Sequence, residues 1–455
     1  MTETHPTSEA LEQFLLGQLS SLETRDIARH LLTGCEECHG AMACLWESSE
    51  GEEEPVQAEE AVAVRDGYDE VLDRVFARVV AAEAAVEEQK IVGRRLYGEL
   101  MQVPEARRHL LVGNSQRFKN RMLCECFIEE AQEAGHDDPH RAIAIAKLAT
   151  LVADRLEVED CDAEEALNGL RARAWAQLGN AFRLVFDLAG SEQAFSVAES
   201  WLDDRPVSLL DRARVLVLRA SLRLDQLRLP EAFQLFDRGA FIYRKLGQWH
   251  LLGRTLLQKA LVCEESGDLE GEMRLLRQAL DLIDPQADPR VFLAARHNLI
   301  RALHDNGRSR EAFALLFHTR PLYLKAGDRM TLLKLRWLEG VVAFGLRRIE
   351  QAEAAFREVR DAYGELGLKY DAALVSLDLA GVYVVQRRAS DVRRMAEETL
   401  AIFSACETHM EAMAALAVFR DAANLDRAEL ELVRKVSAFL KRARNNPDLH
   451  FSPSS

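Results

Sequence analysis

Residues 267–285 read GDLEGEMRLLRQALDLIDP, and this stretch decides the fold. Its apolar residues recur at spacings of three and four: Leu275, Leu276, Ala279, Leu280 and Ile283. This spacing places them on one stripe of an α-helix. A single helix cannot bury such a stripe alone, so the segment predicts a helix that packs against neighbouring units.

The landmarks of this stretch return every 40 residues along the chain. One column of small or apolar residues comprises Ala220, Ala260, Ile300, Gly340 and Ala380. Twelve positions later a second column comprises Ala232, Glu272, Ala312, Ala352 and Val392. Four positions further on, a third comprises Phe236, Leu276, Leu316, Phe356 and Ala396. A fourth column, with turn-forming residues in three of its four members, comprises Gly247, Ala287, Gly327 and Gly367. Four positions before it lie Tyr243, Ile283, Tyr323 and Tyr363. A fixed period of this size predicts a solenoid of stacked helix pairs.

Residues 174–182 read AWAQLGNAF and are followed by Ala194, Phe195 and Ala198. This pattern resembles the W-x-x-L-G-x-x-Y…F-x-x-A pattern of tetratricopeptide repeats, and residues 267–285 resemble the G-D-Y…A-L-x-L-D-P ending of the same family. Glu272 stands where that family usually has Ala, and the period is longer than the usual spacing of about 34 residues. It resembles the longer-helix variants found in bacterial regulators and animal polarity scaffolds. The resemblance covers about 170–405 and implies an all-α, superhelical solenoid that binds protein partners.

The first 46 residues contain a set of possible metal ligands: His5, His30, Cys35 and Cys38. A Cys-x-x-Cys turn puts two thiolates on one side of a tight loop, and a helix that ends near His30 can bring an imidazole to the same point. Two sulfur and two nitrogen ligands in tetrahedral geometry favour zinc, one ion per chain. Metal binding would also supply folding free energy to so small a helical module. The alternatives are a helix end with two incidental cysteines and a redox-active dithiol, and His39 or Cys44 could replace one of the ligands.

Three segments of this module also resemble a family. Residues 5–9 read HPTSE, residues 16–20 read LGQLS, and residues 30–38 read HLLTGCEEC. Together they resemble the H-P…x-G-x-L-s…H-L-x-x-C-x-x-C pattern of zinc-binding anti-sigma domains, with one extra residue between His30 and Cys35. The resemblance covers about 40 residues. It implies a module that, in that family, keeps an extracytoplasmic-function-type sigma factor from RNA polymerase, and whose oxidation in some members releases zinc and the sigma factor.

Composition and periodicity divide the chain into six segments. These are the zinc-binding module (1–46), an acidic linker (47–65), the helical start of the solenoid (66–169), the repeats (170–405), capping helices (406–445) and a disordered tail (446–455). The apolar stripe of 66–91 favours a helix packed on the solenoid, with coiled-coil dimerisation as the alternative. We expect a helix break near Pro104, and we interpret Ser115 and Asp138 as helix N-caps. Residues 136–140, despite their two histidines, fit a loop and cap better than a metal site, and Cys124 and Cys126 fit packing roles.

Whole-chain properties narrow the functional class. The 455 residues carry a net charge of −16, which argues against a nucleic-acid-binding surface. We find no run of 18 apolar residues and no secretory signal, so we expect a cytoplasmic protein without a membrane segment. Eight cysteines in this length do not indicate a secreted disulfide framework. The sequence has no phosphate loop, nucleophile elbow, Rossmann glycine pattern or H-E-x-x-H, and therefore does not support catalysis.

A superhelical array presents a groove lined by the first helix of each pair. The residues that the repeat register places there are Asn180, Arg183, Arg254, His297, Arg301, His304, Lys334, Trp337 and Phe344. Their basic and aromatic character suits an acidic or amphipathic peptide, although any groove displays some residues. The sequence thus predicts a non-enzymatic regulatory protein of the anti-sigma type with a partner-binding solenoid. The alternatives are a scaffold whose zinc module is only structural, and an undetected enzyme or effector activated through the solenoid.

Overall fold

The computed structural model describes residues 5–15, 27, 30, 35, 37–38, 40–41, 87–405, 410–425, 427–443 and 451. The chain forms two compact units, Met1–Glu87 and Glu88–Ser455. The predicted linker at 47–65 and the start of the predicted helix at 66–91 lie outside the described residues. So do the alternative ligands His39 and Cys44.

The first unit begins with helix α1 (Ser8–Leu15). Thr7 starts this helix, because its hydroxyl accepts a hydrogen bond from the Ala10 amide at 3.3 Å and its carbonyl accepts one from the Leu11 amide at 3.0 Å. The side chain of Leu11 is buried, and Ile27 and Cys38 are buried as well. Of the predicted cysteine pair, Cys38 is thus buried, whereas Cys35 is partly exposed.

The second unit opens with a helical segment at 87–101, and Pro104 separates it from α5 (Glu105–Asn114) as predicted. A short 3-10 turn (Gln116–Phe118) follows, with Ser115 as its cap. Helices α6 (Arg121–Asp137) and α7 (Pro139–Arg155) form the next pair. The carboxylate of Asp138 accepts a hydrogen bond from the Arg141 amide at 3.0 Å. Both predicted caps are therefore confirmed.

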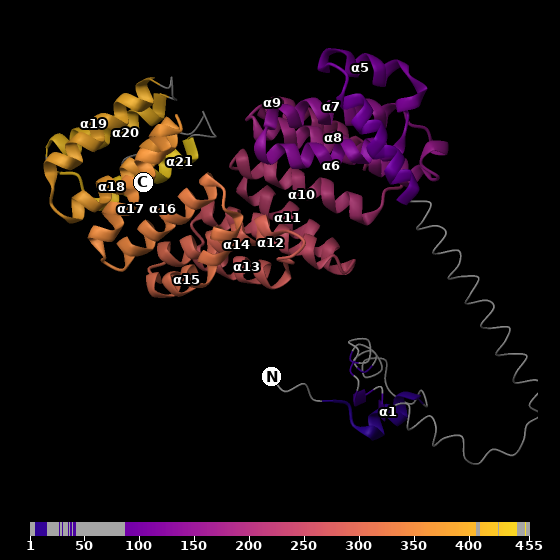
Figure 1. Ribbon diagram of the computed structural model, residues 1–455, viewed down its shortest axis with the longest axis horizontal. Helices are drawn as coiled ribbons and strands as arrows, with labels where there is room; N and C mark the ends of the chain where they lie inside the picture. The colour runs from indigo at the N-terminus through magenta and orange to yellow at the C-terminus, as the bar shows by residue number, and fades with distance from the viewer. Residues whose placement is uncertain are drawn as a thin grey trace, which may run out of the picture. The chain divides into compact units, whose positions relative to one another are not determined.

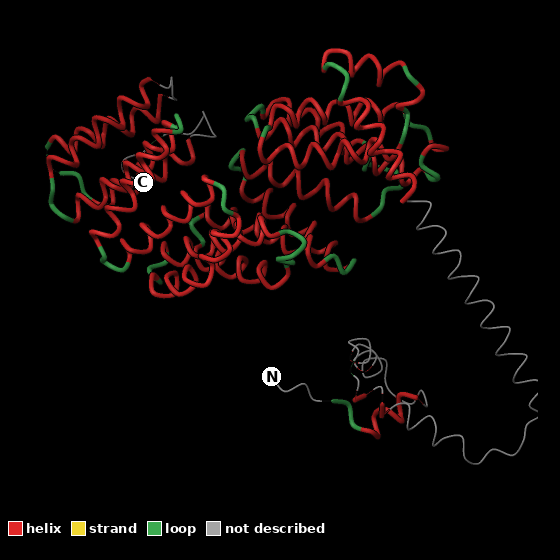
Figure 2. Tube along the Cα trace, viewed as in Figure 1, coloured by secondary structure: helices red, strands yellow, loops and turns green. Residues whose placement is uncertain are grey.

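The remaining helices continue the array in antiparallel pairs, as Figure 1 shows from purple to yellow. The pairs are α8 (Glu164–Leu184) with α9 (Leu188–Ser200), α10 (Leu209–Asp225) with α11 (Leu229–Lys245), α12 (Trp249–Ser266) with α13 (Leu269–Leu282), α14 (Pro289–Asp305) with α15 (Ser309–Ala326), α16 (Arg329–Gly345) with α17 (Ile349–Glu365), and α18 (Lys369–Val385) with α19 (Ala389–Ala405). From α10 to α19, the first residues of successive first helices and of successive second helices are 40 positions apart, which confirms the predicted period. The described residues contain helices and no strand (Figure 2).

The predicted columns are the core of the array. Every member of the first three columns is buried, as are Tyr243, Ile283, Tyr323 and Tyr363. In the α16–α17 unit this position must stay small, because a Cβ atom built on Gly340 would lie 2.8 Å from the ring of Phe356. Some first helices of neighbouring pairs also touch each other, as α8 touches α10 and α14 touches α16. Burial is thus shared between neighbouring units, as expected of a solenoid.

The turn from first to second helix has the same geometry in successive pairs. One residue takes a left-handed conformation, and this residue is a glycine in some pairs and a larger residue in others. Gly267 has φ of 78°, whereas Leu227 has 55° and Arg347 has 61°. The next amide then bonds back to a carbonyl near the helix end, as Arg348 does to Ala343 at 2.9 Å. This Schellman-type closure ends the first helices α8, α10, α12, α14, α16 and α18.

The array ends with α20 (Met410–Asn424) and α21 (Leu430–Ala443). Helix α21 contacts α20 and also α18, the first helix of the preceding pair. Arg434 and Lys441 are exposed, whereas the side chains of Arg442 and Arg444 lie outside the described residues. None of the described helices is both long and apolar enough to cross a membrane.

Candidate functional site

The four predicted metal ligands converge in the first unit. The ligand atoms of His5, His30, Cys35 and Cys38 all lie within 4.8 Å of one another. Nδ1 of His5 lies 3.3 Å from Sγ of Cys35 and 3.5 Å from Sγ of Cys38. Nε2 of His30 lies 3.3 Å from the same Cys38 sulfur. The sequence-distant His5 is thus brought to the Cys-x-x-Cys turn.

These separations fit a tetrahedral metal ion. With metal–sulfur bonds of about 2.3 Å and metal–nitrogen bonds of about 2.0–2.1 Å, tetrahedral angles separate sulfur and nitrogen ligands by about 3.5 Å. The observed nitrogen–sulfur distances of 3.3 to 3.5 Å match this value. The two imidazole rings meet edge to face at 5.3 Å between centroids, so both can point a nitrogen at one centre. The donor set therefore fits a structural zinc ion.

The outer nitrogen of His5 has a carboxylate neighbour. Nε2 of His5 lies 3.3 Å from Oε2 of Glu37, the residue before Cys38. Metal-ligating histidines usually donate their second ring N–H to such a group, which fixes the tautomer and the ring orientation. Burial, followed by the hydrogen bond with Cys35, raises the pKa of the Cys38 thiol.

Cysteines elsewhere have packing environments. Cys124, Cys161 and Cys263 are buried, and Cys126 is partly exposed on the other side of α6 from Cys124. The thiol of Cys124 lies 3.4 Å from the carbonyl of Ala149 on α7. The packing role predicted for this residue is confirmed. Within the part of the chain that the structure describes, no second group of ligand side chains converges as the N-terminal four do.

The residues predicted to line a groove lie on first helices, from α8 to α16. Their arginines are already paired with carboxylates. Nη1 of Arg183 lies 2.7 Å from Asp225, and Nη1 of Arg254 lies 3.6 Å from Asp288. The guanidinium of Arg301 makes two hydrogen bonds to Glu264. The positive charge that the sequence suggests is therefore largely neutralised within the first-helix surface.

Trp337 is the centre of an aromatic and polar cluster on this surface. Its ring stacks on the imidazole of His297, with centroids 6.0 Å apart and planes at 22°. Its Nε1 donates a hydrogen bond to Oδ2 of Asp378 on α18 at 2.8 Å. Nδ1 of His297 in turn lies 2.7 Å from the hydroxyl of Tyr323. The cluster links α14, α16 and α18. It brings together His297 and Trp337, two of the residues predicted from the sequence to line one groove.

Burial sets the charge states in this cluster. It lowers the pKa of His297 to about 4, with nearby Arg301 and Lys334 adding to the effect, so the ring is neutral near pH 7. It also raises the pKa of Asp378, against the influence of Lys441 and the Trp337 hydrogen bond. The surface around Trp337 thus offers a neutral imidazole, a large π-face and one partly buried carboxyl group.

The other predicted groove residues are placed differently. The amide oxygen of Asn180 accepts a hydrogen bond from Nε of Arg183 at 3.0 Å. Lys334 is exposed, whereas Phe344 packs against the C-terminal hydrophobic core. Burial lowers the pKa of His304, and the charge of Arg434 on α21 acts in the same direction. Asp378 and the proximity of α21 could not be predicted from the sequence, because the repeat register alone does not show which helix packs over the last units.

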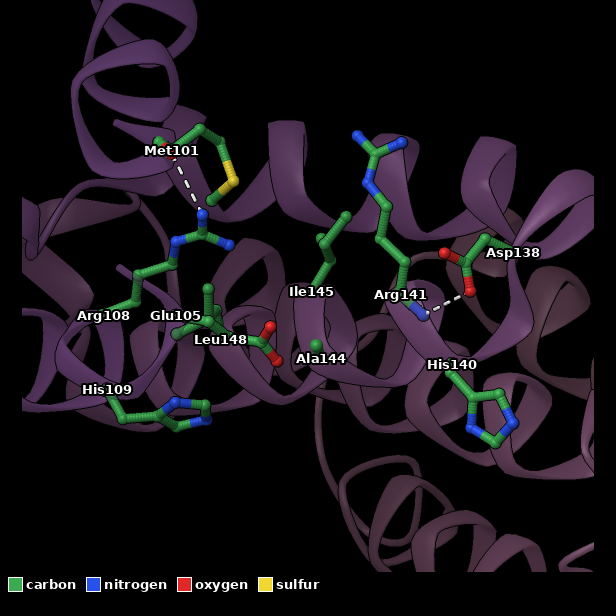
Figure 3. Close-up of a pocket in the computed structure, with 10 residues that line it drawn as sticks. All are labelled: Met101, Glu105, Arg108, His109, Asp138, His140, Arg141, Ala144, Ile145 and Leu148. Atoms are coloured by element: carbon green, nitrogen blue, oxygen red, sulfur yellow. Dashed lines mark hydrogen bonds between the residues drawn. The ribbon is translucent and has the colours of Figure 1, made fainter. Parts of the chain in front are cut away.

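A cavity of about 470 Å³ lies in the N-terminal part of the second unit (Figure 3). It is bounded by α5, by α7 and by Met101. Two of its polar side chains have structural roles, since Arg108 donates to the carbonyls of Met101 and Val103 and Asp138 caps α7. Figure 3 shows the two histidines, His109 and His140, at opposite ends. The cavity therefore does not bring its two histidines together as a catalytic or metal-binding site would.

A second cleft, of about 460 Å³, lies between α15, α16 and α17. Phe313 and Phe317 form its apolar side, and Phe317 is 69% exposed. The guanidinium of Arg348 lies over the Phe313 ring at 5.1 Å. Pro321 interrupts the hydrogen-bond pattern within α15. The cleft is an apolar surface feature outside the Trp337 cluster.

Comparison with known proteins adds support for the fold. No family model matches the chain, and no curated protein matches it. A solved Rap protein complexed with Competence and Sporulation Factor is similar over 71% of this chain and 88% of its own, with 12% identity and a TM-score of 0.53. Aspartyl phosphate phosphatase F from Bacillus subtilis aligns over 88% of this chain and 96% of its own, with 13% identity and a TM-score of 0.48. A signal-transduction ATPase with a tetratricopeptide repeat sensor from Pyrococcus horikoshii aligns over 74% of this chain and 55% of its own, with 14% identity and a TM-score of 0.47.

At these identities the likeness concerns the fold alone. The second unit is a tetratricopeptide-like helical solenoid, and the fold class predicted from the 40-residue period is confirmed.

Proposed function

We propose that this chain is a non-enzymatic regulatory protein that binds a segment of another protein on the first-helix surface of its solenoid. The Trp337 cluster is the observation that carries this proposal, because it places an indole, an imidazole and a carboxyl group on three successive first helices. Tryptophan is a frequent hot spot of protein interfaces, since it combines a large apolar area with a hydrogen-bonding group. A Rap protein of similar fold is complexed with Competence and Sporulation Factor, which supports a partner-binding role for this solenoid.

Charge neutralisation on this surface defines the kind of partner. Arg183, Arg254 and Arg301 have carboxylate neighbours, so they contribute little free positive charge. An acidic peptide would have to displace these carboxylates, each of which is held by a charge-assisted contact. An amphipathic segment that uses apolar contacts and a few hydrogen bonds fits better.

Selection of binding peptides from a random library tests this proposal. Peptides selected on the full chain should lose at least about tenfold in affinity when Trp337→Ala removes the centre of the cluster. The matched control is Trp249→Ala, because Trp249 is an exposed tryptophan at the start of α12. Selected peptides that bind the Trp337→Ala chain as well as the wild type would contradict the proposed surface.

A second candidate function concerns the first unit. We propose that His5, His30, Cys35 and Cys38 hold zinc, and that the zinc-held module binds a sigma factor, as the resemblance to anti-sigma domains implies. The converging donor atoms favour this candidate over incidental cysteines. Zinc would act structurally here, by fixing the helices of a small module.

A sigma factor encoded beside this chain is the appropriate bait. A complex that survives Cys35→Ser/Cys38→Ser would exclude the zinc-dependent mechanism. The control is Cys126→Ser, which changes a partly exposed cysteine of the second unit. If the module is only structural and the chain is a scaffold, deletion of residues 1–92 should leave partner binding intact.

A further inference from the structure

Helix α21 packs its apolar face onto α18. Val433, Val436 and Leu440 are buried on one side of α21, three and four residues apart. The hydroxyl of Tyr370 at the start of α18 donates a hydrogen bond to the carbonyl of Leu440 at 2.6 Å. A stripe of this spacing is the pattern by which an amphipathic helix occupies a receiving surface.

A glycine provides the space for this contact. Gly381 of α18 stands in the same repeat column as Arg301 of α14 and Val341 of α16. A Cβ atom built on Gly381 would lie 3.2 Å from Leu430 and 3.9 Å from Val433. The side chain that the earlier units carry at this position is missing where α21 lies, so α18 is shaped to receive a helix.

The far end of α21 reaches the Trp337 cluster. Nζ of Lys441 lies 5.6 Å from the centre of the Trp337 ring, within the range of a cation–π contact. The same ammonium group lowers the pKa of Asp378, the acceptor of the Trp337 hydrogen bond. A basic side chain of α21 thus complements the one carboxyl group of this cluster.

The fit of α21 is incomplete. Among the described residues, Oγ of Ser437 is buried and has no hydrogen-bond partner. Burying an unpaired hydroxyl is unfavourable. Helix α21 has 14 residues, and an isolated helix of this length is only marginally stable in water. Terminal elements of a solenoid also have fewer neighbours than central ones and open more readily.

We infer that the α16–α18 face is a helix-binding site that α21 occupies within the same chain, and that the external partner is a helix of the same kind. This inference rests on the proposed function of the solenoid and names its partner class and its regulation. The partner helix carries apolar residues at the spacing of Val433, Val436 and Leu440, with a basic residue directly after the last. Because both helices use one surface, the partner binds only after α21 has left it.

The test uses the full chain and a fluorescein-labelled synthetic peptide of residues 427–443, followed by fluorescence anisotropy. The wild-type chain should bind the peptide weakly because α21 competes with it. Val436→Asp/Leu440→Asp in the chain should strengthen peptide binding at least about tenfold, since these residues anchor α21. Ala438→Asp is the matched control, because it adds the same side chain at an exposed position of α21 and should leave binding at the wild-type level.

Changes in the peptide test the chemistry of the site. A Lys441→Glu peptide should bind the Val436→Asp/Leu440→Asp chain several-fold more weakly than the wild-type peptide, because it places a carboxylate beside Asp378. A Ser437→Ala peptide should bind more tightly, because it removes the unpaired hydroxyl. Equal binding of all three peptides would overturn the proposed site.

Hydrogen exchange on the wild-type chain provides a second measurement that does not depend on the folding of a variant. Excess peptide should speed amide exchange in the chain's own α21 and slow it in α18. Unchanged exchange in α21 at saturating peptide would overturn the inference. Neither experiment needs an external partner. Failure to find a partner would therefore count against the proposed function, whereas the peptide and hydrogen-exchange results alone decide whether α21 occupies the site.

Discussion

Oε1 of Glu272 lies 3.5 Å from Nη2 of Arg301 in the interior of the solenoid. Glu272 is only 2% exposed, in a column whose other members are Ala or Val. Arg301 makes its two strong hydrogen bonds to Glu264, so Glu272 receives only a long contact. Burial therefore dominates over the attraction of Arg301 and raises the pKa of Glu272 to about 7.

Glu272 should make the solenoid less stable as pH rises. The unfolded chain releases this proton near pH 4.5, whereas the folded chain keeps it until about pH 7. Stability is thus lost between these two values, by about 1–3 kcal/mol for a shift of this size. Glu272→Gln should raise the free energy of unfolding at pH 8 by this amount and have little effect at pH 4. Urea denaturation at the two pH values measures the difference. A variant that is less stable than the wild type at pH 8 would show that the carboxylate is a needed charge partner of Arg301.

His297 should give the opposite pH dependence. Its pKa in the folded chain is about 4, below the ordinary value of 6.5. Between these two pH values the imidazole is therefore protonated in the unfolded chain and neutral in the folded chain. Stability should fall as pH decreases from about 6.5 to 4, by about 1–3 kcal/mol. His297→Gln should remove this part of the acid sensitivity. Tyr323→Phe is the control, because it removes the hydrogen-bond partner and keeps the imidazole. If His297→Gln retains the full loss of stability in acid, another group must cause it.

The N-terminal donor set should bind one metal ion per chain. Protein purified under reducing conditions should contain one zinc, and replacement by Co²⁺ should give the intense visible absorption of a tetrahedral site with two thiolate ligands. Cys35→Ser/Cys38→Ser should abolish both signals, whereas Cys126→Ser should preserve them. His5→Ala tests the most distant ligand in sequence, whose Nδ1 lies within 3.5 Å of both sulfurs. Full metal content in the double cysteine variant would show that the ion lies elsewhere.

Two glycines of neighbouring helices should respond in opposite ways to Ala. A Cβ atom on Gly340 would lie 2.8 Å from the buried ring of Phe356, so Gly340→Ala should destabilise the chain by about 1–3 kcal/mol. Gly364, near the end of α17, has open space around it, so Gly364→Ala should stabilise by about 0.5–1 kcal/mol through helix propensity. Thermal unfolding of the two variants compares them directly. A gain in stability from Gly340→Ala would mean that the contact between α16 and α17 can adjust to accommodate an added methyl group.

The repeat array could be predicted closely because its signal is periodic. Positions such as Ala260, Gly340 and Ala380 are buried where two helices meet, and the same physical demand recurs in each unit. The metal ligands could be proposed because Cys35 and Cys38 lie close in sequence, and the structure brings His5 and His30 to them. Each of these inferences depends on local spacing or on repetition.

The pairing of charges and the position of α21 could not be predicted in this way. The sequence suggests a free cation at Arg301, and only the fold shows that its guanidinium pairs with Glu264 of α12. Asp378 carries no motif, and its role follows from a hydrogen bond to Trp337 in another unit. The return of α21 onto α18 has no earlier counterpart in the array, so the period contains no information about it.

The turns between paired helices have a consequence for how such a chain can evolve. Leu227, Arg347 and Arg387 adopt the same left-handed geometry that Gly267 and Gly307 adopt in other units. Helix stacking holds these turns, so a lineage can lose the glycine of its repeat signature and retain the architecture. The sequences of the units can then diverge until only the shared fold shows their common ancestry. A duplication or deletion of 40 codons would add or remove one helix pair and still leave a first helix following a second helix.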